Sequence, residues 1–243
     1  MLRSFLIALQ FLTRFPLPAF GRPEDRDVGR SLLFYPLIGL LIGAMLVALD
    51  GVAAGASEAL RAALLLAAWV IVTGGLHLDG LADSADAWVG GLGDRERTLA
   101  IMKDPRSGPA AVTTLVVILI LKFAALQTLV ADGIWPAFLL APLLGRSVIP
   151  LLFLTTPYVR PGGLGAALAT HLPRRAATGV VLATALAILV LMGKSGVLSL
   201  VAAAAMFLLL RAMMTRRING TTGDTVGAMV ELTETAVLMV IAM

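Results

Sequence analysis

Residues 74–108 read GGLHLDGLADSADAWVGGLGDRERTLAIMKDPRSG and separate long apolar stretches on either side. This segment holds six of the chain's 15 acidic residues, namely Asp79, Asp83, Asp86, Asp94, Glu96 and Asp104. The first three are spaced i, i+4, i+7, so a helix would carry them on one face about 60° wide. Carboxylates on one face repel each other, and they are costly to bury without a partner. A divalent cation would remove both problems, so we expect a metal site here.

The residue types favour one kind of metal. Carboxylate oxygens are ligands for Mg²⁺ or Mn²⁺ rather than zinc, and the chain has no cysteine for a thiolate site. A solvated helix start is the alternative interpretation of the aspartates. His77, beside the cluster, is a candidate proton acceptor, metal ligand or interfacial hydrogen-bonding residue.

The composition indicates a membrane protein. Hydrophobic residues make up 59% of the 243 residues and charged residues only 14%, against about 25% charged in soluble proteins. A soluble domain of this size could not bury so much apolar side chain. Nucleic-acid binding is not expected, because the chain has no basic helix or aromatic-interleaved basic patch. We therefore predict one all-α integral membrane domain over residues 1–243.

Apolar runs predict about seven transmembrane helices, with six to eight as the range. The expected spans are residues 31–49, 61–76, 109–130, 136–154, 177–192, 197–210 and 225–242. Residues 2–15 are too short for a span of about 20 residues, and they are predicted to form an interfacial helix. Small residues such as Gly39 and Gly43 predict close helix packing within the bundle.

Basic residues predict the orientation of these spans. With the N-terminus in the cytoplasm, 15 of the 19 Lys and Arg residues fall on the cytoplasmic side, as the positive-inside rule requires. They are Arg3, Arg14, Arg22, Arg26, Arg30, Arg95, Arg97, Lys103, Arg106, Arg160, Arg174, Arg175, Arg211, Arg216 and Arg217. The same alternation places the loops around 77–108 and 211–224, together with residues 155–176, on one side.

A second polar cluster, residues 216–224, reads RRINGTTGD. Thr221 and Thr222, flanked by glycines, let backbone amides approach an anion just before a predicted helix N-terminus, so we expect them to bind substrate phosphate. A plain turn is the alternative. Asp224, Glu231 and Glu234 share one face of the following helix, and we expect that face to meet the aspartates.

Cations accompany the acids. Lys103 and Arg106 lie beside Asp104 in IMKDPRSGP, and Arg146 lies inside an apolar span. Cations next to metal-binding carboxylates suit a substrate that bears phosphate groups. Anchoring of a helix end is the alternative for Lys103 and Arg106. Lys122 and Arg146 are intramembrane cations, and they are predicted to be site residues or partners of the acids.

The segments GGLHLDGLADSADAW and IMKDPRSGP together resemble the cobalamin synthase family, the adenosylcobinamide-GDP ribazoletransferases. The resemblance extends to FLTRFPLP and FYPLIGLLIG near the N-terminus and to NGTTGDTVGAMVELTE near the C-terminus. The family usually has Gly-Gly where this chain has Asn219-Gly220. The resemblance covers most of the chain.

This resemblance implies an enzyme of the bacterial inner membrane that needs Mg²⁺ and whose site faces the cytoplasm. It would join adenosylcobinamide-GDP to α-ribazole or α-ribazole 5′-phosphate and release GMP. A homo-oligomer or a biosynthetic complex is left open.

The site expected from these observations has three parts. Asp83, His77 and Asp104 are candidate catalytic residues. The expected substrate-binding residues are Lys103, Arg106, Arg146, Thr221 and Thr222. The expected metal ligands are Asp79, Asp83, Asp86, Asp224 and Glu231.

Two other classes of protein stay open on the sequence. A CDP-alcohol-type phosphotransferase would carry a DGxxAR run, whereas this chain reads DGLADS and lacks the arginine. A cation transporter would carry carboxylates deep in several spans.

Overall fold

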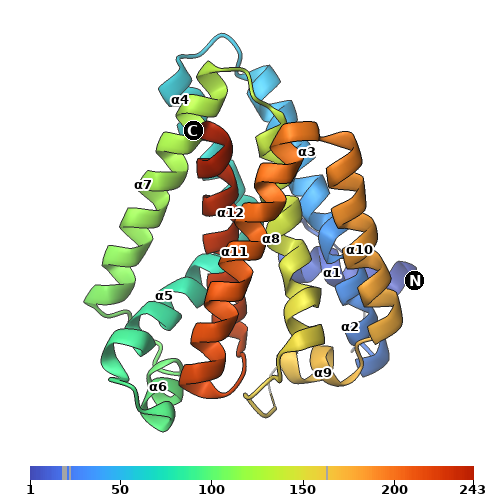
Figure 1. The fold of residues 1–243 in the computed structure, drawn as a ribbon, viewed down its shortest axis with the longest axis vertical. Helices are drawn as coiled ribbons and strands as arrows, with labels where there is room; N and C mark the ends of the chain where they lie inside the picture. The colour runs from blue at the N-terminus through green and yellow to red at the C-terminus, as the bar shows by residue number, and fades with distance from the viewer. Residues whose placement is uncertain (18–20, 22, 163) are drawn as a thin grey trace.

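The computed structural model describes residues 1–17, 21, 23–162 and 164–243, and its fold is all-helical (Figure 1). The helices are α1 (Leu2–Leu12), α2 (Asp25–Ser31), η1 (Leu32–Phe34), α3 (Tyr35–Val52), α4 (Glu58–Thr73), α5 (Leu76–Gly90), α6 (Arg95–Ile101), α7 (Pro109–Ala131), α8 (Pro136–Thr155), α9 (Leu164–Thr170), α10 (Arg174–Leu191), α11 (Gly193–Ile218) and α12 (Gly223–Ala242). Within the described residues β-pairing is limited to one isolated bridge, between Tyr158 and Thr221.

Among the residues that the structure describes, six helical segments are long and apolar enough to cross a membrane. They are Asp25–Val52, Pro109–Ala131, Pro136–Thr155, Arg174–Leu191, Gly193–Ile218 and Gly223–Ala242. A seventh is reached if α4 and α5 are counted as one broken span. The prediction of a polytopic all-α bundle is therefore confirmed.

The helices α5, α6 and α9 gather at one end of this bundle, the lower end in Figure 1, together with the start of α12. The helices α8 and α11 end at this end of the bundle, and α7, α10 and α12 begin there. The segments that connect them therefore lie at the same end. The loops predicted to share one side of the membrane therefore do share one end of the molecule. Arg22, one of the basic residues assigned to that side, lies outside the described residues.

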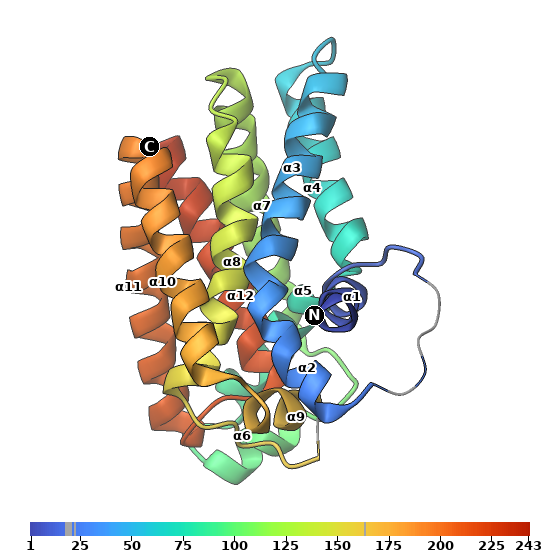
Figure 2. The same cartoon turned by 90° about the vertical axis from the view of Figure 1, so that its right-hand side faces the viewer.

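The N-terminal helix α1 lies across the spans and is viewed almost along its own axis in Figure 2. Its residues Ser4, Ala8 and Leu12 are buried at the spacing i, i+4, i+8, while Met1 and Leu2 are exposed. One face packs and the other is open, as an interfacial helix requires.

Close packing of α3 on α8 forms the centre of the bundle. A Cβ atom added to Gly39 would lie 2.3 Å from the backbone oxygen of Pro142, and one added to Gly43 would lie 2.7 Å from the Cα of Leu139. Only glycine fits at such distances, so the two residues allow the helix backbones to meet. The close packing predicted from Gly39 and Gly43 is thus explained.

The acidic helix does not continue the preceding span. Gly74 and Gly75, both with positive φ (63° and 68°), end α4, and α5 leaves at 87° to it. Glycine adopts this left-handed conformation without steric cost, which explains why the break falls here. The backbone N–H of Arg14 donates to the carbonyl of Val72 at 2.7 Å and ties the segment after α1 to the bend. The break turns α5 across the end of the bundle.

Candidate active site

The site forms where α5 crosses α12. A Cβ atom added to Gly80 would lie 2.8 Å from the backbone oxygen of Asp224 and 3.2 Å from the Cα of Gly227. The two glycines therefore let the helix backbones touch. As a result, Asp79 and Asp83 on α5 are brought close to Asp224 in the first turn of α12.

These three carboxylates influence one another. Asp83 lies on α5, outside the six spans, and burial followed by the charges of Asp79 and Asp224 raises the pKa of its carboxyl to about 6. Like charges that are close together disfavour ionisation in this way. The arrangement concentrates negative charge at one point, and the expectation that Asp224 meets the aspartates of α5 agrees with it.

Arg160 is the basic residue that the sequence analysis missed as a site residue. Its guanidinium donates to the carboxylate of Asp224, with an N–O distance of 3.0 Å, and to the carbonyl of Met102 at 3.2 Å. It belongs to the segment PYVRPGG between α8 and α9. A single arginine in a loop has no spacing pattern, and the only available signal was its place on the same side as the aspartates.

Backbone pairing holds Arg160 in position. The N–H of Val159 donates to the carbonyl of Thr221, and the N–H of Thr221 donates to the carbonyl of Pro157, both at 2.9 Å. A Cβ atom at Gly220 would lie 2.3 Å from the Pro157 oxygen. The turn before α12 thus fixes the Arg160 loop beside Asp224.

Thr221 and Thr222 are buried in this turn, and their hydroxyl groups are used within it. Thr222 caps α12 by accepting from the N–H of Thr225, and the Thr225 hydroxyl accepts from the N–H of Thr222. The Thr221 hydroxyl lies 2.9 Å from that of Thr225. Both side chains therefore shape the turn, and the binding of substrate phosphate at Thr221 and Thr222 stays a prediction. Asn219, where the family usually has glycine, has φ of 60°, a conformation that Asn tolerates better than most residues.

A cavity of about 240 Å³ opens beside the carboxylates. Its polar lining comes from Asp79, Asp224, Arg160 and His77. Its apolar lining comes from helices α1, α3, α5, α8, α9 and α12, through Phe11, Tyr35, Leu76, Ile149, Phe153, Leu168 and Val226. A pocket with mostly apolar walls and a few charged groups is typical of a small-molecule site.

Asp86 has a different role from the one predicted. Its two carboxylate oxygens accept from the N–H groups of Gly108, at 2.5 Å, and Ala111, at 3.0 Å. These are unpaired donors at the first turn of α7, so Asp86 caps that helix from a distance. Each oxygen accepts one hydrogen bond, so the structure shows Asp86 as a cap, and its predicted role as a metal ligand stays a prediction.

Asp104 and Arg106 form an exposed ion pair, with a closest N–O distance of 2.6 Å. The hydrogen bonds from Arg106 lower the pKa of Asp104 to about 2. A carboxylate with so low a pKa is a weak proton acceptor near neutral pH. Lys103 is exposed in the same loop. Neither Lys103 nor Arg106 lines the cavity, and both belong to the surface around it.

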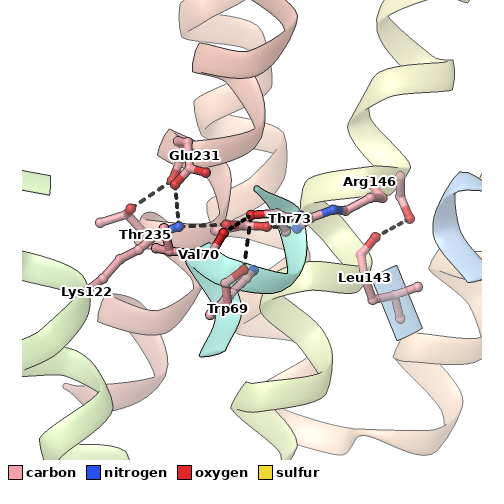
Figure 3. Close-up of polar contacts among 10 residues, drawn as sticks. Trp69, Val70, Thr73, Lys122, Leu143, Arg146, Glu231 and Thr235 are labelled. Atoms are coloured by element: carbon pink, nitrogen blue, oxygen red, sulfur yellow. Dashed lines mark hydrogen bonds and ion pairs between the residues drawn. The ribbon is translucent and has the colours of Figure 1, made fainter. Parts of the chain in front are cut away.

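The deeper charges form a separate network inside the bundle (Figure 3). Lys122 of α7 donates to Glu231 and, at 2.6 Å, to Glu234 of α12, and Arg146 of α8 pairs with Glu234. Lys122 also lies 4.7 Å from the ring centroid of Trp69. All four charged side chains are buried. The prediction that Lys122 and Arg146 are partners of the intramembrane acids is confirmed.

This network places two predicted site residues away from the aspartates. Glu231 lies seven residues after Asp224, about 10 Å along the helix, and its carboxylate pairs with Lys122. Arg146 is fully buried, pairs with Glu234 and does not line the cavity. The structure thus gives Glu231 and Arg146 ion-pair partners, and their metal and substrate roles stay predictions. Both deep carboxylates lie on α12, unlike the several spans expected of a cation transporter.

The carboxylates fit a metal ion only in part. Among the described residues, no three Asp, Glu or His side chains are close enough together to hold a metal by themselves. Magnesium, however, is usually bound by one or two carboxylates together with water and substrate phosphates. The three carboxylates Asp79, Asp83 and Asp224, with Arg160 as a nearby cation, leave net negative charge that suits that mode of binding.

Comparisons with known proteins identify the family of the chain. The family described as cobalamin-5-phosphate synthase matches residues 4–242. The chain is 58% identical to the adenosylcobinamide-GDP ribazoletransferase of Pseudomonas fluorescens Pf-5 and 59% identical to that of Pseudomonas putida F1. Each match covers 98% of both chains. No solved structure matches.

These matches cover nearly the whole chain. They run over α1, the α5–α12 crossing and the ion-pair network alike. The chain belongs to the cobalamin-5-phosphate synthase family and is a membrane-bound transferase of cobalamin biosynthesis.

Proposed function

We propose that the enzyme transfers the phosphocobinamide group of adenosylcobinamide-GDP to a hydroxyl group of α-ribazole or its 5′-phosphate. The observation that carries this proposal is the convergence of Asp79, Asp83 and Asp224 beside Arg160. Asp79, Asp224 and Arg160 also line a cavity. The relatives' name specifies a ribazole transfer from adenosylcobinamide-GDP. Carboxylates next to a guanidinium are the groups needed to handle a pyrophosphate.

The reaction is a displacement at phosphorus. The oxygen of the acceptor hydroxyl attacks the phosphorus that carries the cobinamide, and a new P–O bond forms. The bond from that phosphorus to the bridging oxygen breaks, and its electron pair leaves with GMP. Asp83 accepts the proton of the attacking hydroxyl. Positioning and charge neutralisation account for most of the acceleration in such reactions.

Magnesium is proposed as the cofactor, held by Asp79 and Asp224 together with substrate phosphate oxygens and water. The bound ion would neutralise charge on the phosphates and on the leaving oxygen. Arg160, already paired with Asp224, would bind a non-bridging phosphate oxygen. Lys103 and Arg106, exposed at the same end, would contact the nucleotide portion of the donor that stays outside the cavity.

The active site is proposed to face the cytoplasm of a bacterium from its inner membrane. Basic residues are concentrated in the loops at the site end, and these mark the cytoplasmic side of bacterial membrane proteins. The nucleotide-bearing donor would reach the site from that compartment.

Asp83→Asn tests the assignment of the carboxylates. The variant keeps the size of the side chain but removes its charge and its ability to accept a proton. We expect kcat/KM for GMP release to fall at least about 100-fold, in the range typical for the loss of a general base. Asp132→Asn, an exposed aspartate after α7, is the matched control and should keep full activity. Full activity of folded Asp83→Asn would exclude the proposed role.

A further inference from the structure

Several aromatic residues line the cavity beside the carboxylates. The chain has nine Phe, three Trp and two Tyr, and both tyrosines and two of the phenylalanines line this one cavity. They form two stacked pairs. The rings of Phe11 and Tyr35 are 6.3 Å apart, and those of Phe153 and Tyr158 are 5.9 Å apart. Such walls favour a flat aromatic ligand, which stacks on ring faces.

Two buried polar atoms of the cavity residues, Arg160 Nε and His77 Nδ1, have no hydrogen-bond partner in the part of the chain that the structure describes. His77 lines the cavity and is 4% exposed, and its Nδ1 has no hydrogen-bond partner among the described residues. Buried polar groups in proteins are almost always hydrogen-bonded, so an unpaired one indicates a missing partner. A ligand with a single ring nitrogen that accepts a hydrogen bond would supply it.

Size decides which substrate can enter. The volume of 240 Å³ equals the share of about eight water molecules in the liquid, which suits a bicyclic base with part of its sugar. A corrin macrocycle with its side chains is several times larger, so the corrinoid must stay outside the cavity.

Polarity then separates the two nucleosides of the reaction. Guanine carries several donors and acceptors on its edge, and each one left unpaired against apolar walls opposes binding. A benzimidazole attached to ribose has one free acceptor nitrogen and otherwise apolar edges. The apolar walls and the unpaired Nδ1 of His77 match the benzimidazole. The other unpaired atom, Arg160 Nε, belongs to the guanidinium that pairs with Asp224 at the polar lining, where the ribose and phosphate would lie.

Building on the proposed function, we propose that this cavity binds the aromatic base of the acceptor nucleoside and that His77 recognises its free ring nitrogen. In the tautomer protonated on Nδ1, the imidazole donates a hydrogen bond to that nitrogen. The base lies among the aromatic rings, and the ribose lies toward Asp79, Asp224 and Arg160 at the polar lining. His77 is therefore a specificity residue rather than the proton acceptor.

A binding cycle with two ligands tests the role of His77. The ligands are the benzimidazole riboside 5′-phosphate and its indole analogue, in which C–H replaces the acceptor nitrogen. By calorimetry, wild-type protein should bind the benzimidazole about tenfold more tightly, the effect of one hydrogen bond. His77→Phe should bind both ligands equally, whereas His77→Asn, whose amide can donate from a similar place, should restore part of the preference.

Kinetics separate recognition from proton transfer. For His77→Phe we expect the KM for the benzimidazole substrate to rise about tenfold while kcat changes little, since the lost bond contributes to binding. A wild-type protein without preference, or a variant that keeps the preference and loses kcat for both acceptors, would overturn the assignment of His77.

Phe153→Leu tests the place of the base. It should raise the KM for the acceptor several-fold and leave the KM for adenosylcobinamide-GDP unchanged, while Phe123→Leu, a half-buried residue that does not line the cavity, should alter neither. A rise in the KM of the donor alone would show that the cavity holds guanine and would overturn the proposal. Selective binding of the benzimidazole without any transfer would refute the proposed function and leave this inference standing.

Discussion

At the level of single residues, Asp83 and Asp86 lie about one turn apart on α5 but have different surroundings. Burial, together with the charges of Asp79 and Asp224, raises the pKa of Asp83, whereas Asp86 accepts two backbone hydrogen bonds from the start of α7. Their common spacing in the sequence predicts one acidic face. The partner that occupies each side chain decides its role.

Asp86→Ala and Asp86→Asn distinguish a helix cap from a metal ligand. Loss of the cap in the alanine variant should destabilise the protein by about 1–2 kcal/mol, seen as a lower midpoint of thermal unfolding in detergent. Asparagine keeps one acceptor oxygen, so Asp86→Asn should retain most of the stability and most of the transfer activity. A loss of activity in Asp86→Asn as large as that in Asp83→Asn would instead support metal binding by Asp86.

Single residues also show which parts of the site could not be predicted from the sequence. Spacing identified Asp79, Asp83 and Asp224, because a helical repeat reports which side chains share a face. It could not separate free carboxylates from those already bonded, as with Asp86 and Glu231. The place of Arg160 in the site could not be predicted from the sequence. It depends on backbone pairing between the Arg160 loop and Thr221, segments about 60 residues apart.

At the level of elements, the crossing of α5 and α12 assembles the site. Gly80 and Gly227 let the helices touch, and the bend at Gly74-Gly75 directs α5 across the end of the bundle. The sequence does not reveal this bend, since apolar and acidic residues follow one another without a gap. Two glycines with positive φ changed the direction of the chain, and this depends on backbone conformation rather than on hydropathy.

Gly80→Ala tests the crossing. The added methyl group would lie 2.8 Å from the backbone oxygen of Asp224, so the helices must separate. We expect destabilisation of about 1–3 kcal/mol, as for other overpacked positions, and at least a tenfold loss of activity because Asp224 moves away from α5. Gly179→Ala on α10, where nothing lies within 4 Å of the new Cβ, is the control. Unchanged activity in Gly80→Ala would show that the contact does not position the carboxylates.

At the level of the whole molecule, charged side chains form two groups, one inside the bundle and one at its end. The network of Lys122, Arg146, Glu231 and Glu234 joins α7, α8 and α12 inside the bundle, and the aspartates with Arg160 lie at its end. Removing one member of a buried ion pair is strongly destabilising, so the inner network holds the helices in register. Hydropathy and charge counts predicted the spans and their common end, because both are properties of local sequence.

The absence of cysteine in the sequence allows a direct test of orientation. Single cysteines would replace exposed residues at the two ends, Ser107 near the site and Ala54 between α3 and α4. In intact cells whose outer membrane is permeabilised, a membrane-impermeant thiol reagent should label Ala54→Cys and leave Ser107→Cys unlabelled. The reverse pattern would place the site outside the cytoplasm and contradict the orientation given by the basic loops.

The central claim is that carboxylates at this end of the bundle support a metal-dependent transfer between adenosylcobinamide-GDP and α-ribazole phosphate. The most direct measurement is the activity of the purified protein with both substrates, with Mg²⁺ and after chelation, reading GMP release and cobalamin product. We expect equal amounts of both products with Mg²⁺ and none without it. Transfer that continues after complete removal of divalent metal, or folded protein that forms neither product with Mg²⁺, would contradict the claim.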